Sequence, residues 1–266
     1  MPNSAPVAEA LRGTATRLHE AHRTGKPVPS PTRDGTVTTL ADAYRVQTEL
    51  LQLRIAQGES VRGLRVALTS VAARRALDAA EPVLGHLTAR MFLSGHRPLD
   101  APGLIRPQIG AALAFVLGAP LSGPGVTTAD AVRAVECVLP ALDIADSRIE
   151  DGPASAPDLV ADNAGGHTVI LGTTPAAPSG TDLRLAGVVL HRDGEVAATG
   201  AGGMALGSPL EALVWAANTW QHTEFTLTAG SVVLVCGLTP PVPLDPGSTV
   251  TASLAGLGTV TAVRTR

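Results

Sequence analysis

Aromatic side chains are scarce in this chain of 266 residues, at 2% of its composition. Few rings are therefore available for the stacking platforms on which single-stranded nucleic acids bind. The formal net charge of −3 offers no basic surface to a nucleic acid either. We expect no nucleic-acid partner, and a core built mainly from Ala, Val and Leu.

Long apolar stretches are also missing from the sequence. No uninterrupted apolar run reaches the ~20 residues that a membrane-spanning helix requires. The stretch up to Gly25 carries charged side chains at helical spacing, without the apolar block and cleavage site of a signal peptide. The sequence thus predicts no membrane partner and a cytoplasmic protein.

Cysteine and lysine are nearly absent. Cys137 and Cys236 lie in apolar runs far apart in the sequence, which favours two buried thiols over a disulfide framework or a zinc cluster. Lys26 is the only lysine among 20 basic residues, and it lies in a proline-rich loop. Schiff-base chemistry therefore has no other candidate residue.

Aliphatic residues, in contrast, are abundant and ordered. Hydrophobic residues make up 45% of the chain, enough for the core of a medium-large domain. Apolar residues that recur about every 3.6 positions predict helices over residues 5–24 and 40–58. Thr39 and Asp42 resemble a capping box at the start of the second helix. Runs rich in Val, Leu and Thr predict seven strands: Val61–Leu68, Ile109–Leu117, Thr168–Leu171, Val188–Leu190, Ser231–Val235, Val250–Leu254 and Thr259–Val263.

Two further helices and one turn complete the pattern. Residues 128–138 predict a helix that ends before Pro140, and Ser208 caps a predicted helix over 209–220. Asp193-Gly194 predicts a hairpin between two strands.

Strands and helices do not alternate regularly, which disfavours a doubly wound sheet. The sequence therefore predicts an α+β fold with two parts. A helical N-terminal region over residues 1–60 packs on a β-rich region over 61–266, which forms a rolled, mostly antiparallel sheet.

A glycine-rich stretch over residues 199–207 precedes the last predicted helix. Its glycine spacing differs from the dinucleotide-binding fingerprint and no βαβ unit follows, so we interpret it as a turn that leads into a capped helix. The backbone amides of Gly202 and Gly203 are candidates to bind a carboxylate.

Seven histidines show no metal-ligand spacing. His19 and His22 are expected to face solvent from the first helix. His86 follows a glycine in a strand-to-loop context and is the histidine we single out as a candidate site residue. Its alternative role is that of a hydrogen-bonded structural histidine.

Polar residues gather where a buried-looking run ends, from Asp143 to Asp151. A carboxylate at the end of a core segment needs a partner, so Asp143 and Arg148 are a plausible pair, either structural or catalytic. Asp162 and Asn163 form a similar polar pair before a strand, either as a turn cap or as a ligand contact.

Taken together, several segments resemble the 2-keto-4-pentenoate hydratase and 4-oxalocrotonate decarboxylase branch of the fumarylacetoacetate hydrolase superfamily. They run in family order over roughly residues 40–265. The resemblance implies a helical N-terminal part on a rolled, mostly antiparallel sheet, as in the C-terminal domain of fumarylacetoacetate hydrolase. The matching segments are Gly63–Ser70, Arg106–Ile109 running into Leu113–Leu117, Val138–Asp143 through Ser147-Arg148, Val160–Ala164, Thr199–Gly203 with Leu206-Gly207 and Pro209, and Gly237–Pro241.

The resemblance also implies a chemistry. Members of this branch hold a divalent Mg or Mn ion with three carboxylates, and the ion chelates the keto-acid end of the substrate. The two metal-binding Glu positions of the family fall on Gly110 and Ala112, and the third carboxylate falls on Asp143. One Asp cannot hold such an ion at micromolar concentration, so we expect no bound metal and no cofactor.

Other polar positions of the family pocket have also changed. The family's Lys falls on Arg65, its Asp before a Phe-Gly pair on Val83, and a substrate-contacting Ser on Gly165. The His before the helix-initiating Pro falls on Ser208. Shorter and less polar side chains imply a wider pocket for a bulkier, more apolar ligand.

The expected function is a repurposed, metal-independent lyase, in secondary metabolism. It would dehydrate, hydrate, isomerise or cyclise an unsaturated carbonyl compound. Asp143 is the expected acid/base, with Arg65 and Arg148 as cationic stabilisers of an enolate or carboxylate. Substrate contacts are expected from residues in and near the matching segments: His86, Gln108, Gly110, Ala112, Asp162, Asn163, Gly165, Gly202, Gly203 and Thr239.

Two alternatives stay open. The chain is either a non-catalytic subunit that supports an active paralogue, since hydratase and decarboxylase members of the family associate, or an ordinary metal-dependent hydratase or decarboxylase. A rolled sheet on its own leaves apolar edges to cover, so we also expect a homo-oligomer.

Overall fold

The computed structural model describes residues 4–95, 97–100, 103–220 and 226–266. Its helices are α1 (Ser4–Thr24), α2 (Leu40–Ala56), α3 (Val71–Ala76), α4 (Thr128–Ala134), α5 (Ala156–Ala161) and α6 (Pro209–Thr219), with short 3-10 turns η1 (Ala89–Met91), η2 (Asn163–Gly165) and η3 (Gly202–Met204). Its strands are β1 (Val61–Ala67), β2 (Val83–Thr88), β3 (Phe92–Leu93), β4 (Gln108–Leu117), β5 (Val135–Ala145), β6 (Gly166–Leu171), β7 (Gly187–Arg192), β8 (Glu195–Ala201), β9 (Val232–Val235), β10 (Val242–Pro243), β11 (Thr249–Leu254) and β12 (Gly258–Val263).

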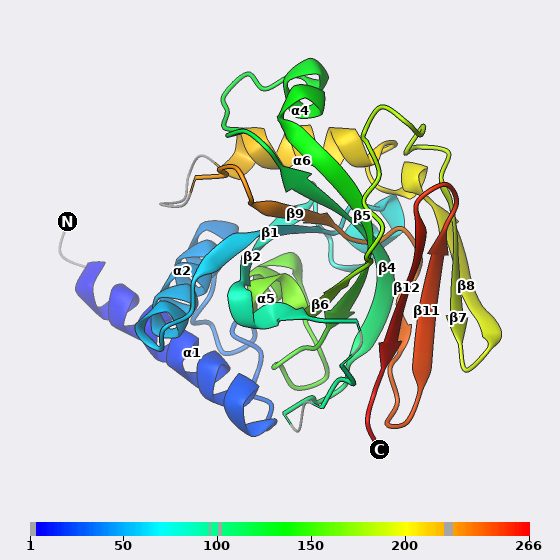
Figure 1. The fold of residues 1–266 in the computed structure, drawn as a ribbon. Coiled ribbons are helices and arrows are strands. Elements are labelled where there is room, and N and C mark those ends of the chain that lie inside the picture. The colour runs from blue at the N-terminus through cyan, green and yellow to red at the C-terminus, as the bar shows by residue number, and fades with distance from the viewer. Residues whose placement is uncertain (1–3, 96, 101–102, 221–225) are drawn as a thin grey trace.

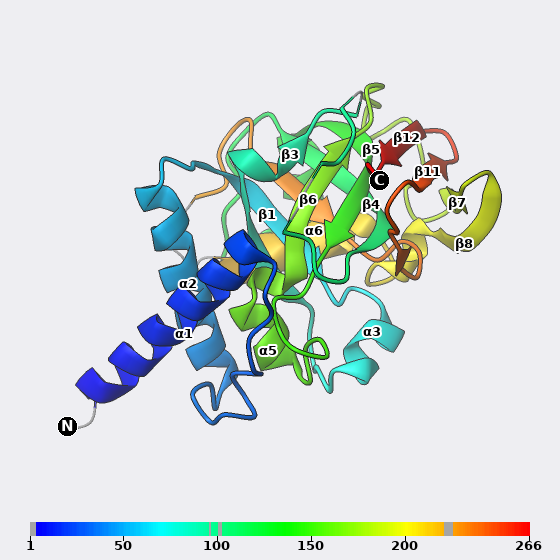
Figure 2. The same cartoon turned by 90° about the horizontal axis from the view of Figure 1, so that it is seen from below.

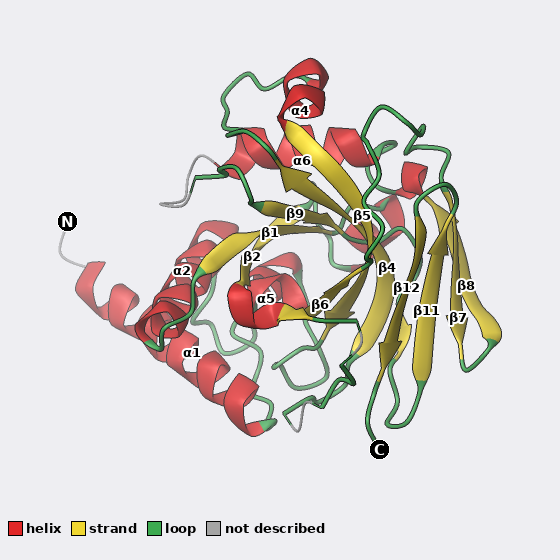
Figure 3. Ribbon diagram, viewed as in Figure 1, coloured by secondary structure: helices red, strands yellow, loops and turns green. Residues whose placement is uncertain are grey.

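The strands form a larger and a smaller sheet. The larger one is curled and has the order β2-β1-β9-β4-β5-β6-β3, with β10 paired to β4 (Figure 1). Its β1–β9 and β3–β6 pairs are parallel and the others are antiparallel, so the sheet is mixed. The smaller, antiparallel sheet has the order β12-β11-β7-β8 and lies beside β4 and β5 (Figure 3).

Helices α1 and α2 lie on the side of the larger sheet away from the smaller sheet, as Figures 1 and 2 both show. The Thr39 hydroxyl caps α2 by accepting a hydrogen bond from the Asp42 amide at 3.1 Å. Apolar side chains such as Leu18 and Leu50 join α1 and α2 to α5 in a core of their own. Among the described residues, no helix combines the length and apolar character needed to cross a bilayer.

Strand alternation gives the larger sheet two different faces. Ile109, Leu113 and Phe115 of β4 belong to the main core, which also contains α6 and the smaller sheet. The residues between them include Gly110 and Ala112, which face the opposite side. That second face carries the candidate site.

The predicted α+β fold is confirmed, and the seven predicted strands all occur. The first two helices, the helix after Ser208 and the Asp193-Gly194 hairpin also occur. The division at residue 60 stays a prediction.

The helix predicted over residues 128–138 is wrong beyond Ala134. Thr127 and Asp130 form a capping box for α4, but β5 starts at Val135, where a β-rich run finds β4 as a partner. Pro140 lies inside β5 because β6 pairs only from Ala141 onward, so no neighbouring strand needs a donor from Pro140 on that side.

Candidate active site

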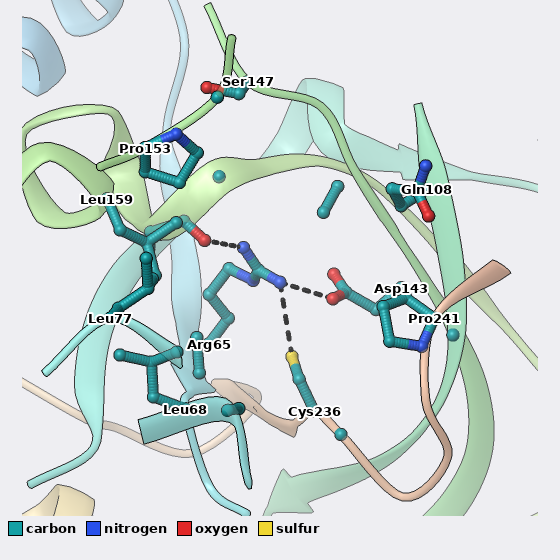
Figure 4. Close-up of a pocket in the computed structure, with 18 of the residues that line it drawn as sticks. Arg65, Leu68, Leu77, Gln108, Asp143, Ser147, Pro153, Leu159, Cys236 and Pro241 are labelled. Carbon is teal, nitrogen blue, oxygen red and sulfur yellow. Dashed lines mark hydrogen bonds and ion pairs between the residues drawn. The ribbon is translucent and has the colours of Figure 1, made fainter. Parts of the chain in front are cut away.

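A cavity of about 500 Å³ lies at the second face of the larger sheet, where β5 and β9 end and β4 begins (Figure 4). One part of its wall is polar and includes Arg65, Gln108, Asp143 and Thr239. Most of the remaining wall is apolar, with contributions from Leu68, Leu77, Pro153, Leu159 and Pro241. Such a mixture suits a small molecule with one polar end.

Arg65 and Asp143 form a buried ion pair in this cavity. Arg65 Nη2 donates to Asp143 Oδ2, and Arg65 Nη1 donates to the Ala164 carbonyl oxygen. Arg65 is 3% exposed and Asp143 8% exposed. The pair crosses the sheet, because β1 and β5 are separated by β9 and β4.

Glycines make room for the long Arg65 side chain. A Cβ atom at Gly166 would lie 2.8 Å from Arg65 Cδ, and one at Gly85 would lie 3.1 Å from Arg65 Cγ. Gly85 is the strand partner of Arg65 in the β1–β2 ladder, so it lies on the same face. The buried arginine therefore depends on two positions that lack a side chain.

Cys236 completes the contacts of this pair. Arg65 Nη2 donates to Cys236 Sγ at 3.6 Å. Burial by itself would lower the pKa of Arg65, but Asp143 and Cys236 together raise that pKa above its ordinary value. The guanidinium thus stays charged at any working pH.

The ion pair keeps unused hydrogen-bonding atoms. Arg65 Nε and Asp143 Oδ1 are buried and have no hydrogen-bond partner among the described residues. Buried polar atoms are normally satisfied, and exceptions point to function or to an unseen ligand. The pair that lines the cavity therefore keeps one unused donor and one unused acceptor.

Arg148 does not pair with Asp143, which corrects the pairing expected from the sequence. Arg148 Nε donates to Asp162 Oδ1 at 2.6 Å, and the Arg148 amide donates to Asp162 Oδ2 at 2.9 Å. Both side chains are about 1% exposed. Arg148 and Asp162 thus use their polar atoms on each other. The predicted catalytic role of Arg148 and the predicted ligand role of Asp162 stay predictions.

Asp146 fixes the backbone just before strand β4. Its two carboxylate oxygens accept hydrogen bonds from the Ile105 and Arg106 amides, at 2.8 and 2.7 Å. The side chain is 2% exposed, although Asp146 belongs to the cavity wall. Asp146 is therefore occupied as a backbone clamp.

Four of the substrate-contact residues expected from the sequence line the cavity: Gln108, Gly110, Gly165 and Thr239. Ala112 lies on the same face of β4 but is fully buried among apolar side chains. The Thr239 hydroxyl accepts from the Ala111 amide at 3.2 Å, which fixes the loop after β9 against β4.

The expected role of Gly202 and Gly203 as anion-binding amides does not agree with the structure. The Gly202 amide donates to the Ala186 carbonyl oxygen at 3.0 Å, and the Gly203 amide donates to the Arg184 carbonyl oxygen at 2.8 Å. Both donors are already used in the backbone, so neither is available to a carboxylate.

His86 and Asn163 are joined to each other. The Asn163 side chain accepts from the His86 amide at 2.8 Å and donates to the His86 carbonyl oxygen at 3.0 Å. The His86 ring points to a different cavity, of about 460 Å³, and packs edge-on against Trp220. Burial, with a smaller effect of Arg54, lowers the pKa of His86 to about 3, so its ring is neutral.

His22 differs from its sequence prediction as well. It is half-buried and its ring lies 5.0 Å from that of His167, between α1 and β6. Burial and then Arg148 lower the pKa of His22 to about 2.

The sequence pattern assigned no site role to several residues of the cavity, Cys236 and Asp146 among them. Cys236 was interpreted only as a buried thiol, and Asp146 received no role. The position of Cys236, directly after the buried strand β9 and before Gly237, is a signal that could have placed it at the end of a strand.

The cavity offers few ligands for a divalent cation. Asp143 is paired with Arg65, Asp146 accepts two backbone amides, and Asp151 is exposed in a loop. Among the described residues, no group of three or more His, Cys, Asp or Glu side chains is placed to hold a metal ion. The residues present do not fit Mg or Mn, which take several oxygen ligands.

A curled mixed sheet with helices on its flanks and a cavity on its second face defines a protein of the fumarylacetoacetate hydrolase fold class. The family model described as "Fumarylacetoacetate (FAA) hydrolase C-terminal" matches residues 61–263, and the chain belongs to this family.

Known relatives cover nearly the whole chain. A 2-keto-4-pentenoate hydratase from Paraburkholderia xenovorans (strain LB400) is 38% identical over 92% of this chain and 91% of its own length. A 4-oxalocrotonate decarboxylase from Pseudomonas putida is 33% identical over 96% of this chain and 94% of its own. The solved structure of a 4-oxalocrotonate decarboxylase from Pseudomonas putida G7, complexed with magnesium and adipate, superposes with a TM-score of 0.92 at 33% identity, covering 97% of this chain and 98% of that one. These relatives are lyase-type enzymes.

Proposed function

We propose that this chain is a metal-independent lyase-type enzyme that acts on an unsaturated carbonyl compound. The reaction is a dehydration, hydration, isomerisation or cyclisation, and the substrate is bulkier and more apolar than 2-keto-4-pentenoate. The observation that carries the proposal is the Arg65–Asp143 pair, which lies in a mostly apolar cavity with one carboxylate oxygen unused.

Asp143 is the proposed acid/base. Its Oδ2 atom is fixed by Arg65, so Oδ1 has a defined direction and is free to exchange a proton with the substrate. These reactions move a proton next to a carbonyl group, where negative charge develops on oxygen. A rigidly placed carboxylate is suited to that transfer.

Arg65 is the proposed oxyanion stabiliser. Three acceptors hold its guanidinium: Asp143, the Ala164 carbonyl oxygen and Cys236. A guanidinium that is already oriented stabilises developing charge without reorganisation, but it cannot act as an acid. The positive charge of Arg65 therefore takes over part of the task that a metal ion has in relatives.

The donor set supports metal independence. The family's metal-binding carboxylate positions correspond to Gly110, Ala112 and Asp143, and here the only carboxylate of the three is bound to Arg65. Gly110 contributes no side chain to the cavity wall, and a Cβ atom there would lie at an ordinary contact distance of 3.7 Å from Pro241 Cα. The absence of a long carboxylate side chain at this wall position supports a larger substrate.

The test is a turnover screen of the full chain after exhaustive treatment with a chelator. The panel pairs small 2-keto-enoates with enones and dienones that carry bulky apolar substituents. We expect turnover of a bulky member with the chelator present, and its loss in Asp143→Asn. Turnover only of small keto-acids, and only after Mg or Mn is added back, would contradict the proposal.

An ordinary metal-dependent hydratase or decarboxylase is the second candidate. Its supporting observation is the likeness over nearly the full length to the 2-keto-4-pentenoate hydratase and to the magnesium-bound decarboxylase structure. The add-back of Mg or Mn in the same screen separates the two candidates.

We also propose that the chain forms a homo-oligomer. Strand β8 is an edge strand of the smaller sheet, and Val196 on it is 61% exposed. Light scattering at micromolar concentration tests this, and a monomer would refute it.

A further inference from the structure

Cys236 lies in the cavity wall, but the proposed acid/base pair gives it no chemical task. Its backbone is held on both sides, because its amide donates to the Val66 carbonyl oxygen at 3.1 Å and its carbonyl oxygen accepts from Thr69 Oγ1 at 2.6 Å. Gly237 follows at φ +80, where a Cβ atom would lie 2.9 Å from Thr69 Oγ1. The sulfur therefore has a fixed position.

The Cys236 sulfur and the Asp143 carboxylate accept hydrogen bonds from the same nitrogen. Arg65 Nη2 donates both to Cys236 Sγ, at 3.6 Å, and to Asp143 Oδ2 (Figure 4). A soft nucleophile, a fixed cation and a carboxylate thus meet at one point of the cavity. This is the set of groups that addition to a polarised double bond requires: nucleophile, oxyanion stabiliser and proton acceptor.

Two further observations support a ligand site at this point. Asp143 is more than nine-tenths buried and its Oδ1 atom has no partner among the described residues. The cavity of about 500 Å³ beside it has apolar walls that include Leu77 and Leu159. Unused polar atoms beside an apolar space fit a carbonyl compound with a hydrocarbon body.

We propose that Cys236 adds reversibly to the β-carbon of an unsaturated carbonyl compound bound in this cavity, which gives a covalent thioether. The substrate class rests on the proposed function; the covalent step goes beyond it.

The electrons and protons of the step balance without a co-reactant. The sulfur–carbon bond forms while the electron pair of the carbon–carbon double bond moves toward the carbonyl oxygen, and Arg65 stabilises the resulting enolate. The thiol proton passes to Asp143 Oδ1 and from there to the α-carbon. In reverse, Asp143 removes the α-proton, the carbon–sulfur bond breaks and the sulfur regains its proton. Rotation about the former double bond within the adduct interconverts cis and trans isomers.

The environment makes this thiol selective. Burial and the Asp143 carboxylate raise the pKa of Cys236 above its ordinary value, so few molecules carry a thiolate before a substrate binds. A reagent that needs a preformed thiolate should therefore react slowly. A bound enone can react faster, because Asp143 removes the proton as the bond forms.

Cys137 provides a matched control within the same molecule. It lies on β5, outside the cavity lining, and is more exposed than Cys236. An unspecific electrophile should thus label Cys137 first. A reagent that exploits the cavity should reverse that order.

The experiment treats the full chain with the apolar enone 4-phenylbut-3-en-2-one, traps adducts by borohydride reduction of the ketone, and follows both cysteines by peptide mass spectrometry. We expect Cys236 to be labelled faster than Cys137 by the enone and more slowly by iodoacetamide. Asp143→Asn should slow the enone reaction at Cys236 by roughly 10²-fold, the low end of what a positioned base contributes, and leave Cys137 unchanged. Faster labelling of Cys137 by the enone, or no effect of Asp143→Asn, would overturn the proposal.

Turnover separates this inference from the proposed function. On a substrate found by the chelator screen, Cys236→Ser, which is close in size, and Cys236→Ala should both lose turnover by roughly 10² or more. If both variants keep turnover while Asp143→Asn loses it, the covalent step is refuted and the acid/base assignment stands. If all three keep it, both are refuted.

Discussion

Arg148 with Asp162 and Arg65 with Asp143 are both buried arginine–aspartate pairs, but they differ in how completely their polar atoms are used. Every nitrogen of the Arg148 side chain has an acceptor within 2.6 Å: Asp162 Oδ1, the Asp146 carbonyl oxygen and the Asp162 carbonyl oxygen. Both Asp162 oxygens accept as well. The Arg65–Asp143 pair leaves Arg65 Nε and Asp143 Oδ1 unused beside a cavity.

This difference distinguishes a structural ion pair from a functional one. A fully satisfied buried pair fixes the chain, because removing any member leaves an uncompensated charge. A partly satisfied pair is costly to keep unless a ligand or a reaction uses the spare atoms. We therefore propose that the first pair serves the fold and the second the chemistry.

The largest expected effect is on stability, from Asp162→Asn. The two oxygens of Asp162 accept from Arg148 Nε and from the Arg148 amide, so an amide NH₂ group must face one of these donors. The substitution should lower the free energy of unfolding by about 3–5 kcal/mol, as when a buried pair loses one charge. Urea denaturation measures it.

Asp143→Asn is the matched comparison. The Asn oxygen can keep the contact with Arg65 while its NH₂ group takes the unused Oδ1 position. The loss should be about 1.5–3 kcal/mol, the value of a hydrogen bond to a charged group. Equal losses in the two variants would remove the distinction between the pairs.

Acid should destabilise the surroundings of the Arg148–Asp162 pair. Burial, followed by Arg148 and Arg54, lowers the pKa of His167 from 6.5 to about 3. Between these values the unfolded chain binds a proton that the native chain does not, so stability falls as pH drops below 6.5. Each such histidine contributes a slope of ~1.4 kcal/mol per pH unit.

His167→Gln should reduce the dependence of stability on pH by the contribution of one histidine. Denaturation between pH 4 and pH 6 measures it, because this range is roughly the middle of the window between the two pKa values. Comparing slopes rather than absolute values removes the packing cost of the substitution. An unchanged slope would show that His167 is not held neutral by its buried position.

A smaller effect is expected where Arg65 is enclosed. In Gly166→Ala the new Cβ would lie 2.8 Å from Arg65 Cδ, and the Arg65 side chain is held by its three acceptors and cannot simply move away. Overpacking should cost about 1–3 kcal/mol and displace Arg65. Thermal unfolding measures the first, and a crystal structure of the variant the second.

The smallest effect is expected at Gly110. The nearest atom to a Cβ there is Pro241 Cα, at an ordinary contact distance of 3.7 Å. Gly110→Ala should therefore stabilise β4 slightly, by about 0.5–1 kcal/mol, because Gly is unfavourable inside a strand. A destabilisation as large as that of Gly166→Ala would contradict the ordinary contact distance found at this position.

Much of this fold follows from local sequence patterns. Runs such as Val61–Leu68 and Ile109–Leu117 are strands because β-branched and aliphatic residues dominate them. The start of β5 is predicted as helix, because the capping box at Thr127 begins one there. The pairing of β5 with β4 ends that helix. Local propensity cannot reveal that competition.

The site was located more coarsely. The family resemblance brought Arg65 and Asp143 to attention, but proximity in sequence suggested Arg148 as the partner of Asp143. The actual partner is 78 residues away in sequence, on another strand. Only the strand order brings β1 and β5 to one face, and no local signal in the chain encodes that order.

The most direct test of the account measures turnover and unfolding free energy on the same preparations of Asp143→Asn and Asp162→Asn, with a chelator present. We expect Asp143→Asn to stay folded and to lose turnover by roughly 10² or more, whereas the Asp162→Asn molecules that remain folded keep their turnover. Near-complete turnover by folded Asp143→Asn would contradict it.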